Sequence, residues 1–334
     1  MSFLFPSSTI TLDAALRDLV RGSPRARANA ARALGDVTEA GERRRAVEAL
    51  IAALEDDLPE VRMEACSSLG ELREPAAVQV LIKRLDDGIA AVRQHAAIAL
   101  GSIGDVAAFA PLAQALVEGP ADLRFQAATS LAEIDAARAF DPIAKALDDK
   151  DPQVVAAAAL SLGAIGDRKA QELLAPKLAH ADAGARFDVA YALAELGDAR
   201  GRDVLAAAVT DPERAWDAVT ALKRLGTVDD AEALGRALLA KGTPPEAAVL
   251  AAGALIQVAP DHPHRDAARR VLIAGLTARK GHVRGLAIEQ LGVGGGAWAK
   301  APLEKLAKNG KGSEFLDAIA QALRDIDARS QGAT

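Results

Sequence analysis

The sequence predicts an all-α fold, an α-solenoid (α/α superhelix) of about ten two-helix repeats. Three observations lead to this fold class. The composition favours helices, because half of the 334 residues are hydrophobic but only 3% are aromatic, which leaves Ala, Leu, Val and Ile as the main apolar residues. One leucine recurs along the chain, and the apolar residues around it follow helical periodicity.

The recurring leucine, here called the anchor, sets the repeat length. Its successive spacings are 35, 31, 31, 31, 31, 29, 33, 36 and 32 residues. The anchors are Leu34, Leu69, Leu100, Leu131, Leu162, Leu193, Leu222, Leu255, Leu291 and Leu323. Spacings near 31 residues accommodate two short helices and their turns, so each anchor marks one two-helix unit.

Each unit reads as a helix A followed by a helix B that carries the anchor. In helix B, apolar residues stand eight and four before the anchor, at the anchor and three after it, as in Val92, Ala96, Leu100 and Ile103. These steps place all four on one helical face. The segment 76–85 illustrates helix A, whose last leucine lies sixteen residues after an anchor.

Turn chemistry separates the predicted helices. Asp151-Pro152, Asp211-Pro212 and Thr243-Pro244 each place a capping side chain before a proline, which suits the start of a helix. Glycines follow four anchors directly, and we expect them to permit close approach of neighbouring helices. These glycines are Gly70, Gly101, Gly163 and Gly292.

A two-helix unit cannot bury its own apolar face, but stacked units make a continuous core. We therefore expect one solenoid domain over residues 1–334, with repeats over about 11–328. Residues 1–10 are expected to cap the first unit, and residues 329–334 to form a short tail.

The pattern from Val92 to Asp105, Val-Arg-x-x-Ala-Ala-x-x-Leu-Gly-x-Ile-Gly-Asp, closely resembles the HEAT-like repeats first recognised in phycobilin lyase subunits. The resemblance implies that helix B lines the concave side, which is the usual partner surface. It also implies a ladder in which an arginine seven before each anchor pairs with an aspartate from a turn. The arginines are Arg27, Arg62, Arg93, Arg124, Arg186 and Arg284, and the candidate partners are Asp57, Asp87, Asp151, Asp182 and Asp211.

Catalytic or metal chemistry finds little support in the sequence. The single cysteine, Cys66, excludes a Cys-x-x-Cys site, and His262 and His264 are close together but lack a further ligand pair. We therefore expect no enzyme activity, no cofactor and no metal. The formal net charge of -6 disfavours nucleic acid. The absence of an apolar span or a secretory signal predicts a cytoplasmic protein without membrane contact.

Helical geometry indicates one surface for recognition. Positions six, five and two before the anchor point away from the core, and several carry aromatic, apolar or acidic residues. A patch of apolar groups with a polar rim is typical of a recognition surface. The candidate partner-binding residues are Met63, Gln94, His95, Ile98, Phe125, Thr129, Leu160, Phe187, Asp188, Tyr191, Trp216 and Asp217.

The sequence therefore predicts a non-catalytic scaffold or adaptor that binds a protein or peptide in its helix-B groove. The acidic positions favour a partner with basic residues. Three alternatives stay open: the rings are ordinary packing between units, the chain is a lyase-like subunit that holds a tetrapyrrole and a client protein, or the solenoid holds DNA. The last needs a basic groove, which the acidic positions disfavour. The oligomeric state is unknown.

Overall fold

The fold was analysed in a computed structural model that describes residues 11–308 and 310–332. Within these residues the regular structure is entirely helical, and twenty α-helices form ten consecutive pairs, as the anchors predict. The chain divides into two compact units, residues 1–170 and 171–334. The expected N-terminal cap, residues 1–10, lies outside the described residues.

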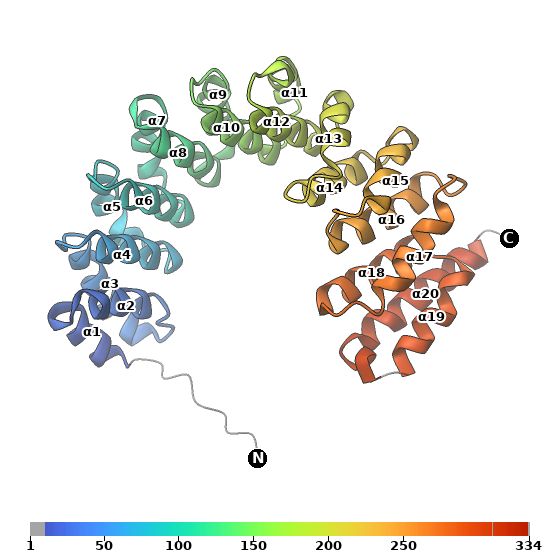
Figure 1. The fold of residues 1–334 in the computed structure, drawn as a ribbon. Coiled ribbons are helices and arrows are strands. Elements are labelled where there is room, and N and C mark those ends of the chain that lie inside the picture. Colours follow the sequence, from blue (N-terminus) through green and yellow to red (C-terminus); the bar gives the residue numbers. More distant parts are fainter. Residues whose placement is uncertain (1–10, 309, 333–334) are drawn as a thin grey trace. The chain divides into compact units, whose positions relative to one another are not determined.

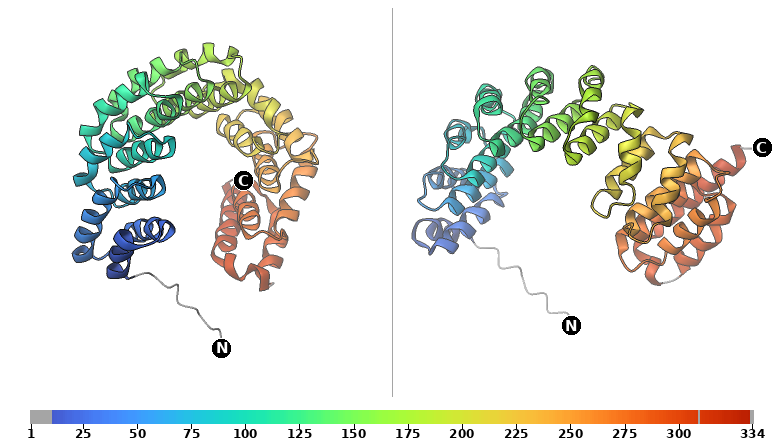
Figure 2. Two further views of the ribbon diagram at one scale, coloured as in Figure 1. Left: turned by 60° about the vertical axis from the view of Figure 1, so that its left-hand side comes forward. Right: turned by 45° about the horizontal axis from the view of Figure 1, so that its top comes forward.

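The first unit contains five helix pairs in two layers. Helix B of each pair packs on helix B of the next, and in Figure 1 α4, α6 and α8 lie on the inner side of the bend of this unit, with α5 and α7 outside. Figure 2 shows the same two layers from other sides. The helices are α1 (Leu12–Arg21), α2 (Pro24–Gly35), α3 (Ala40–Ala53), α4 (Pro59–Glu71), α5 (Val78–Arg84), α6 (Ala90–Ile103), α7 (Phe109–Glu118), α8 (Ala121–Ile134), α9 (Ala136–Ala146) and α10 (Pro152–Ile165).

The second unit repeats this arrangement with more irregular A helices. Its helix-B layer is formed by the even-numbered helices, which again pack on one another in order. The helices are α11 (Ala170–Leu174), α12 (Ala183–Glu195), α13 (Arg202–Ala208), α14 (Ala215–Leu225), α15 (Ala231–Leu239), α16 (Pro245–Val258), α17 (Arg265–Gly275), α18 (Gly281–Gly294), α19 (Ala297–Lys308) and α20 (Leu316–Gly332). Residues 329–332 continue α20, so the last helix extends past the expected boundary at 328.

Short 3₁₀ turns precede several A helices. They are η1 (Pro75–Ala77), η2 (Val106–Ala108), η4 (Ala199–Gly201) and η5 (Val228–Asp230). Two others lie elsewhere: η3 (Ala175–Ala179) follows α11, and η6 (Gly310–Phe315) precedes the B helix α20. The segment 76–85, predicted as one helix, is accordingly a 3₁₀ turn that leads into α5.

The anchors form the core of both units. Every anchor from Leu34 to Leu291 is fully buried, which confirms the helix-B register. Leu323 differs because it is only partly buried, and the core of α20 is made by Ile319, Ala322 and Ile326. In the last pair, the leucine therefore marks the buried face of helix B less well than the anchors of the other nine pairs do.

Glycines after the anchors allow neighbouring B helices to approach closely. A Cβ added at Gly70 would lie 2.8 Å from the Cα of Ala99, and one at Gly101 would lie 2.9 Å from the Cβ of Ser130. At Gly292 the distance to the Cβ of Ala322 would be 3.1 Å. These contacts confirm the packing role predicted for the three glycines.

The Gly-Asp pair that closes the repeat motif ends one helix and caps the next. Gly104 adopts φ +74° at the end of α6, a left-handed conformation that favours glycine. The carboxylate of Asp105 then accepts a hydrogen bond of 2.8 Å from the backbone N–H of Ala107. Gly166 and Asp167 repeat this arrangement, so the motif fixes the turn between helix B and the following helix A.

Only one of the three predicted capped prolines starts a helix where expected. Asp151 caps α10, whose first residue is Pro152. By contrast, α14 begins at Ala215, three residues after Pro212, because residues 212–214 form a turn. The helix α16 begins at Pro245, one residue later than predicted, and Thr243 does not cap it.

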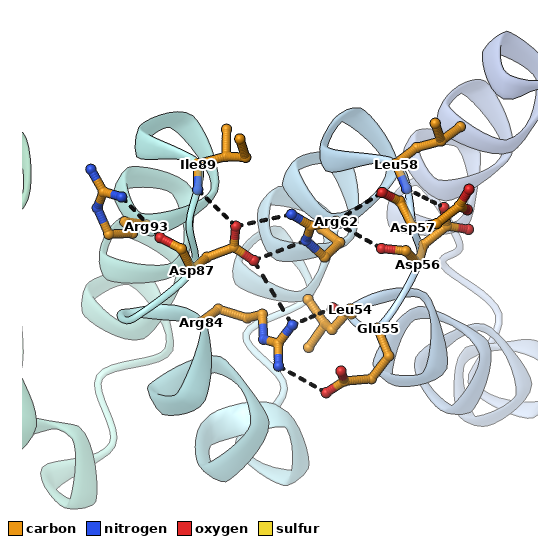
Figure 3. A network of polar contacts seen from close by, with 10 residues as sticks. All are labelled: Leu54, Glu55, Asp56, Asp57, Leu58, Arg62, Arg84, Asp87, Ile89 and Arg93. Atoms are coloured by element: carbon orange, nitrogen blue, oxygen red, sulfur yellow. Dashed lines mark hydrogen bonds and ion pairs between the residues drawn. The ribbon is translucent and has the colours of Figure 1, made fainter.

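Arginines and turn aspartates link consecutive pairs in the first unit (Figure 3). Arg62 donates from Nε and Nη2 to the two carboxylate oxygens of Asp87, both at 2.9 Å, and from Nη1 to the backbone oxygen of Asp56 at 2.8 Å. Arg124 binds Asp149 in the same bidentate way, at 2.7 and 2.8 Å. Each arginine thus holds its own turn and the next one, which fixes the stacking of the pairs.

The ladder partners differ from the prediction at three aspartates. Asp57 and Asp87 pair with Arg27 and Arg62 as expected. Asp151, Asp182 and Asp211 instead accept hydrogen bonds from nearby backbone N–H groups at the starts of helices or turns. These three carboxylates therefore act as local caps rather than as ladder partners.

Candidate functional site

Apolar side chains are exposed on three consecutive B helices of the first unit. Ile98 on α6 is 42% exposed, and Phe125 on α8 and Leu160 on α10 are each 38% exposed. The packing of α6 on α8 and of α8 on α10 makes these three helices neighbours. Their exposure agrees with the outward positions predicted from the helical register.

The other candidate residues of the first unit are half-buried and form local contacts. His95 Nδ1 lies 2.7 Å from the backbone oxygen of Ala91, one turn earlier in α6. Thr129 donates from its hydroxyl to the backbone oxygen of Gln126 at 2.8 Å. Met63 on α4 and Gln94 on α6 are partly accessible beside them. Three of these four side chains are polar, and two of them are engaged with the backbone of their own helix.

A groove of about 360 Å³ lies between α8 and α10 on this layer. Most of its walls are apolar, and Glu133 supplies the one charged side chain among the residues that form it. The lining residues are Thr129, Ala132, Glu133, Ala136, Leu160, Ser161, Ala164 and Ile165. Of this set, only Thr129 and Leu160 are among the residues predicted from the sequence. Extending the same helical register two residues past the anchors would have added Glu133 and Ala164.

In the second unit, Trp216 and Asp217 are exposed at the start of α14, with Trp216 at 42%. Tyr191 on α12 is half-buried and packs against the core, and Asp188 lies one turn before it. We call Asp188, Tyr191, Trp216 and Asp217 the acidic-aromatic patch. It contains four of the five candidate residues of this unit.

Phe187, the fifth candidate, is a correction to the sequence prediction. Its ring is only 5% exposed and belongs to the hydrophobic core of the second unit. The guanidinium of Arg214 covers the ring, with its Cζ 5.2 Å from the ring centroid. The spacing from Leu193 to the next anchor is 29 residues, two shorter than each of the four spacings before it, and Arg214 stands just before the late start of α14. Phe187 is therefore a packing residue.

The carboxylates of the acidic-aromatic patch influence one another. Burial raises the pKa of Asp188, Arg214 opposes this shift, and the negative charge of Asp217 adds to it. Burial also raises the pKa of Tyr191, with further contributions from Glu195 and Asp217. Because Asp217 acts on both groups, the three side chains lie within electrostatic reach of one another.

No cluster of three His, Cys, Asp or Glu residues suited to a metal ion occurs among residues 11–308 and 310–332. The rings of His262 and His264 lie 5.2 Å apart between their centroids, and His262 contacts only one carboxylate, Glu232, at 3.6 Å. Cys66 is buried, and burial raises the pKa of its thiol to about 12. A thiol in that environment is a poor nucleophile at neutral pH.

A family model described as HEAT repeats matches the chain three times, at residues 12–101, 47–132 and 109–186. Together these matches cover residues 12–186, just over half of the sequence. The chain is a HEAT-repeat protein. The helix pairs within residues 12–186 are HEAT repeats, and Ile98, Phe125 and Leu160 are exposed on their B helices.

Solved structures share this HEAT-repeat fold. YibA from E. coli is 18% identical, with a TM-score of 0.53, over 79% of this chain and 95% of its own. Importin beta is 15% identical, with a TM-score of 0.52, over 94% of this chain and 50% of its own. The CpcE and CpcF complex of phycocyanin lyase from Nostoc sp. PCC7120 is 26% identical over 81% of this chain and 97% of the matched chain, with a TM-score of 0.40. No curated protein sequence matches the chain.

Within the described part of the chain, every helix is too short or too polar to cross a membrane.

Proposed function

We propose that this HEAT-repeat protein is a non-catalytic scaffold that binds a partner protein or peptide on its helix-B layer. The observation that carries the proposal is the groove between α8 and α10, which exposed Leu160 lines, together with exposed Phe125 on α8. Exposed apolar side chains beside a hollow are the features that anchor a partner side chain. The repeat family supports protein binding in general terms.

The binding mechanism is the insertion of an apolar side chain into a preformed groove. Alanines line much of the groove, and the B helices beneath it have buried anchors and close packing. A surface that is already ordered loses little conformational entropy when a partner binds. A small number of apolar contacts then suffices for useful affinity.

The charges around these surfaces favour a partner with basic residues. Glu133 lines the groove of the first unit. In the second unit, Asp217 directly follows exposed Trp216 in α14, and Asp188 lies on the neighbouring helix α12. Carboxylates placed next to apolar anchors attract and orient a cationic partner, and they repel an anionic one. This arrangement supports a protein or peptide ligand over a nucleic acid.

The test compares the double variant Phe125→Ala, Leu160→Ala with the control Val117→Ala. Val117 is exposed on the helix-A layer of the same unit, so its substitution removes exposed apolar surface away from the groove. Proteins captured from the native cell by the wild type and the control, but not by the double variant, are purified and their affinities measured directly. A partner whose Kd is unchanged by the double variant, with circular dichroism confirming equal helicity, would reject this surface as the binding site.

A further inference from the structure

Three rings of this protein carry an arginine that also contacts a carboxylate. The guanidinium of Arg138 lies 4.1 Å above the Phe109 ring and 3.9 Å from Asp135. Arg269 lies over the ring of Trp298 and 3.6 Å from Asp266. Arg284 lies over Phe315 and pairs with Glu314. The fold thus repeatedly combines an aromatic face, a guanidinium and a carboxylate, an arrangement stabilised by cation–π and ionic attraction.

The acidic-aromatic patch has two of these three components. Trp216 is exposed, and no guanidinium of the described residues lies over its ring or that of Tyr191. Asp188 and Asp217 have no hydrogen bond from a side chain and no ion pair within residues 11–308 and 310–332. Half-buried Asp188 therefore bears a charge that lacks a close partner.

The nearest arginines of the same unit are engaged elsewhere. Arg214 covers the ring of Phe187 and donates to the backbone oxygen of Ala183 at 3.4 Å. Arg224 pairs with Glu195, with 2.9 Å between Nε and Oε1. The positive charge of Arg214 acts on Asp188 from a longer distance and lowers its pKa. The direct guanidinium contact seen at the other three rings is missing from this patch.

We propose that the acidic-aromatic patch binds the guanidinium of an arginine in the partner protein. The inference rests on the proposed scaffold function and specifies the chemistry of one contact. The two carboxylates receive the N–H groups, and the aromatic rings of Tyr191 and Trp216 contact the planar face. Arginine suits this arrangement better than lysine because its flat guanidinium donates in a fixed fork and stacks on rings.

The test titrates an acetylated and amidated pentapeptide, Ala-Ala-Arg-Ala-Ala, against the full chain. The variant Trp298→Phe serves as the background, since it leaves Trp216 as the only tryptophan and keeps a ring beneath Arg269. We expect a saturable change in tryptophan fluorescence. The same peptide with citrulline, which has the shape of arginine without its charge, should bind at least about tenfold more weakly.

Two isosteric variants in that background locate the contact. Asp188→Asn and Asp217→Asn should each weaken the arginine peptide about tenfold while leaving the circular dichroism spectrum unchanged. Equal binding of the arginine and citrulline peptides would overturn the proposal. So would wild-type affinity in both asparagine variants, or the absence of saturation up to about 10 mM peptide.

The peptide test is independent of the groove in the first unit. The double variant Phe125→Ala, Leu160→Ala should bind the arginine peptide with unchanged affinity, because neither residue belongs to the acidic-aromatic patch. A loss of partner capture with normal peptide binding supports both proposals. If the double variant still captures the partner and binds the peptide normally, the groove is rejected as the partner site and the guanidinium site stands. If the arginine peptide does not bind the Trp298→Phe background, only the guanidinium site is rejected.

Discussion

Lys223 on α14 donates a hydrogen bond of 2.9 Å from Nζ to Oε1 of Gln290 on α18, across the intervening helix α16. Gln290 is completely buried at a position where other B helices carry Ser68, Ser130 or Ala254. The link is possible because α16 has Gly253 where the glutamine side chain crosses, and a Cβ there would lie 2.5 Å from Oε1. Burial lowers the pKa of the Lys223 ammonium, so this hydrogen bond satisfies a partly desolvated cation.

Gly253→Ala should therefore destabilise the second unit. The added methyl group would displace the Gln290 amide and leave polar atoms of Gln290 and Lys223 without partners, at a cost of about 1–3 kcal/mol. Urea unfolding followed by circular dichroism measures the loss. Gly242→Ala is the matched control, because nothing lies within 4 Å of a Cβ at that position. Equal stability of the two variants would contradict the crossing geometry.

Arg62→Ala should lower the stability of the first unit. The substitution removes the bidentate contact to Asp87 and the hydrogen bond to the backbone oxygen of Asp56, and leaves a buried carboxylate without its main partner. The expected cost is about 1.5–3 kcal/mol in the free energy of unfolding. Arg44→Ala removes an exposed pair with Glu48 and should cost less than about 0.5 kcal/mol. A cost for Arg62→Ala as small as for this control would show that the ladder contributes little.

Glu246 predicts a pH-dependent contribution to stability in the second unit. A hydrogen bond with His282, a backbone hydrogen bond and a contact with Lys280 lower its pKa from 4.5 to about 2. A carboxyl group with a lowered folded pKa stabilises the fold above its unfolded value, and this contribution disappears as the pH falls toward 2.

Glu246→Gln should accordingly reduce the free energy of unfolding at pH 6 and have a smaller effect at pH 3. Urea unfolding at both pH values measures the difference from wild type. Glu304→Gln, at an exposed position of α19, is the control and should show little pH-dependent difference. An effect of Glu246→Gln that is constant between the two pH values would argue against the lowered pKa.

Phe187→Ala and Trp216→Ala should differ strongly in their effect on stability although the two rings occupy the same helix-B position. Loss of the buried Phe187 ring leaves a cavity beneath Arg214 and should cost about 3–5 kcal/mol. Loss of exposed Trp216 should change the unfolding free energy by less than about 0.5 kcal/mol. Chemical unfolding of both variants tests the contrast, and similar costs would mean that the exposure of the rings is misassigned.

The repeat and its core could be read from the sequence because one leucine and its apolar neighbours recur in helical register. The exposure of Phe125 and Trp216 follows from that same register. Phe187 shares it and is nevertheless buried, since its cover comes from Arg214, a residue placed by a shortened turn that periodicity does not describe. Likewise, spacing alone does not distinguish an aspartate that caps a helix, such as Asp151, from one that receives an arginine, such as Asp149.

The lone thiol of Cys66 gives the chain a built-in reporter. Cys66 lies in α4 and is completely buried, burial raises the pKa of its thiol to about 12, and the sequence has no other cysteine. Thiol reagents therefore label the molecule only when the packing around α4 opens. The labelling rate then reports local unfolding in the first unit. The second unit has no cysteine and is not labelled, so local unfolding of the first unit can be measured separately within the intact protein.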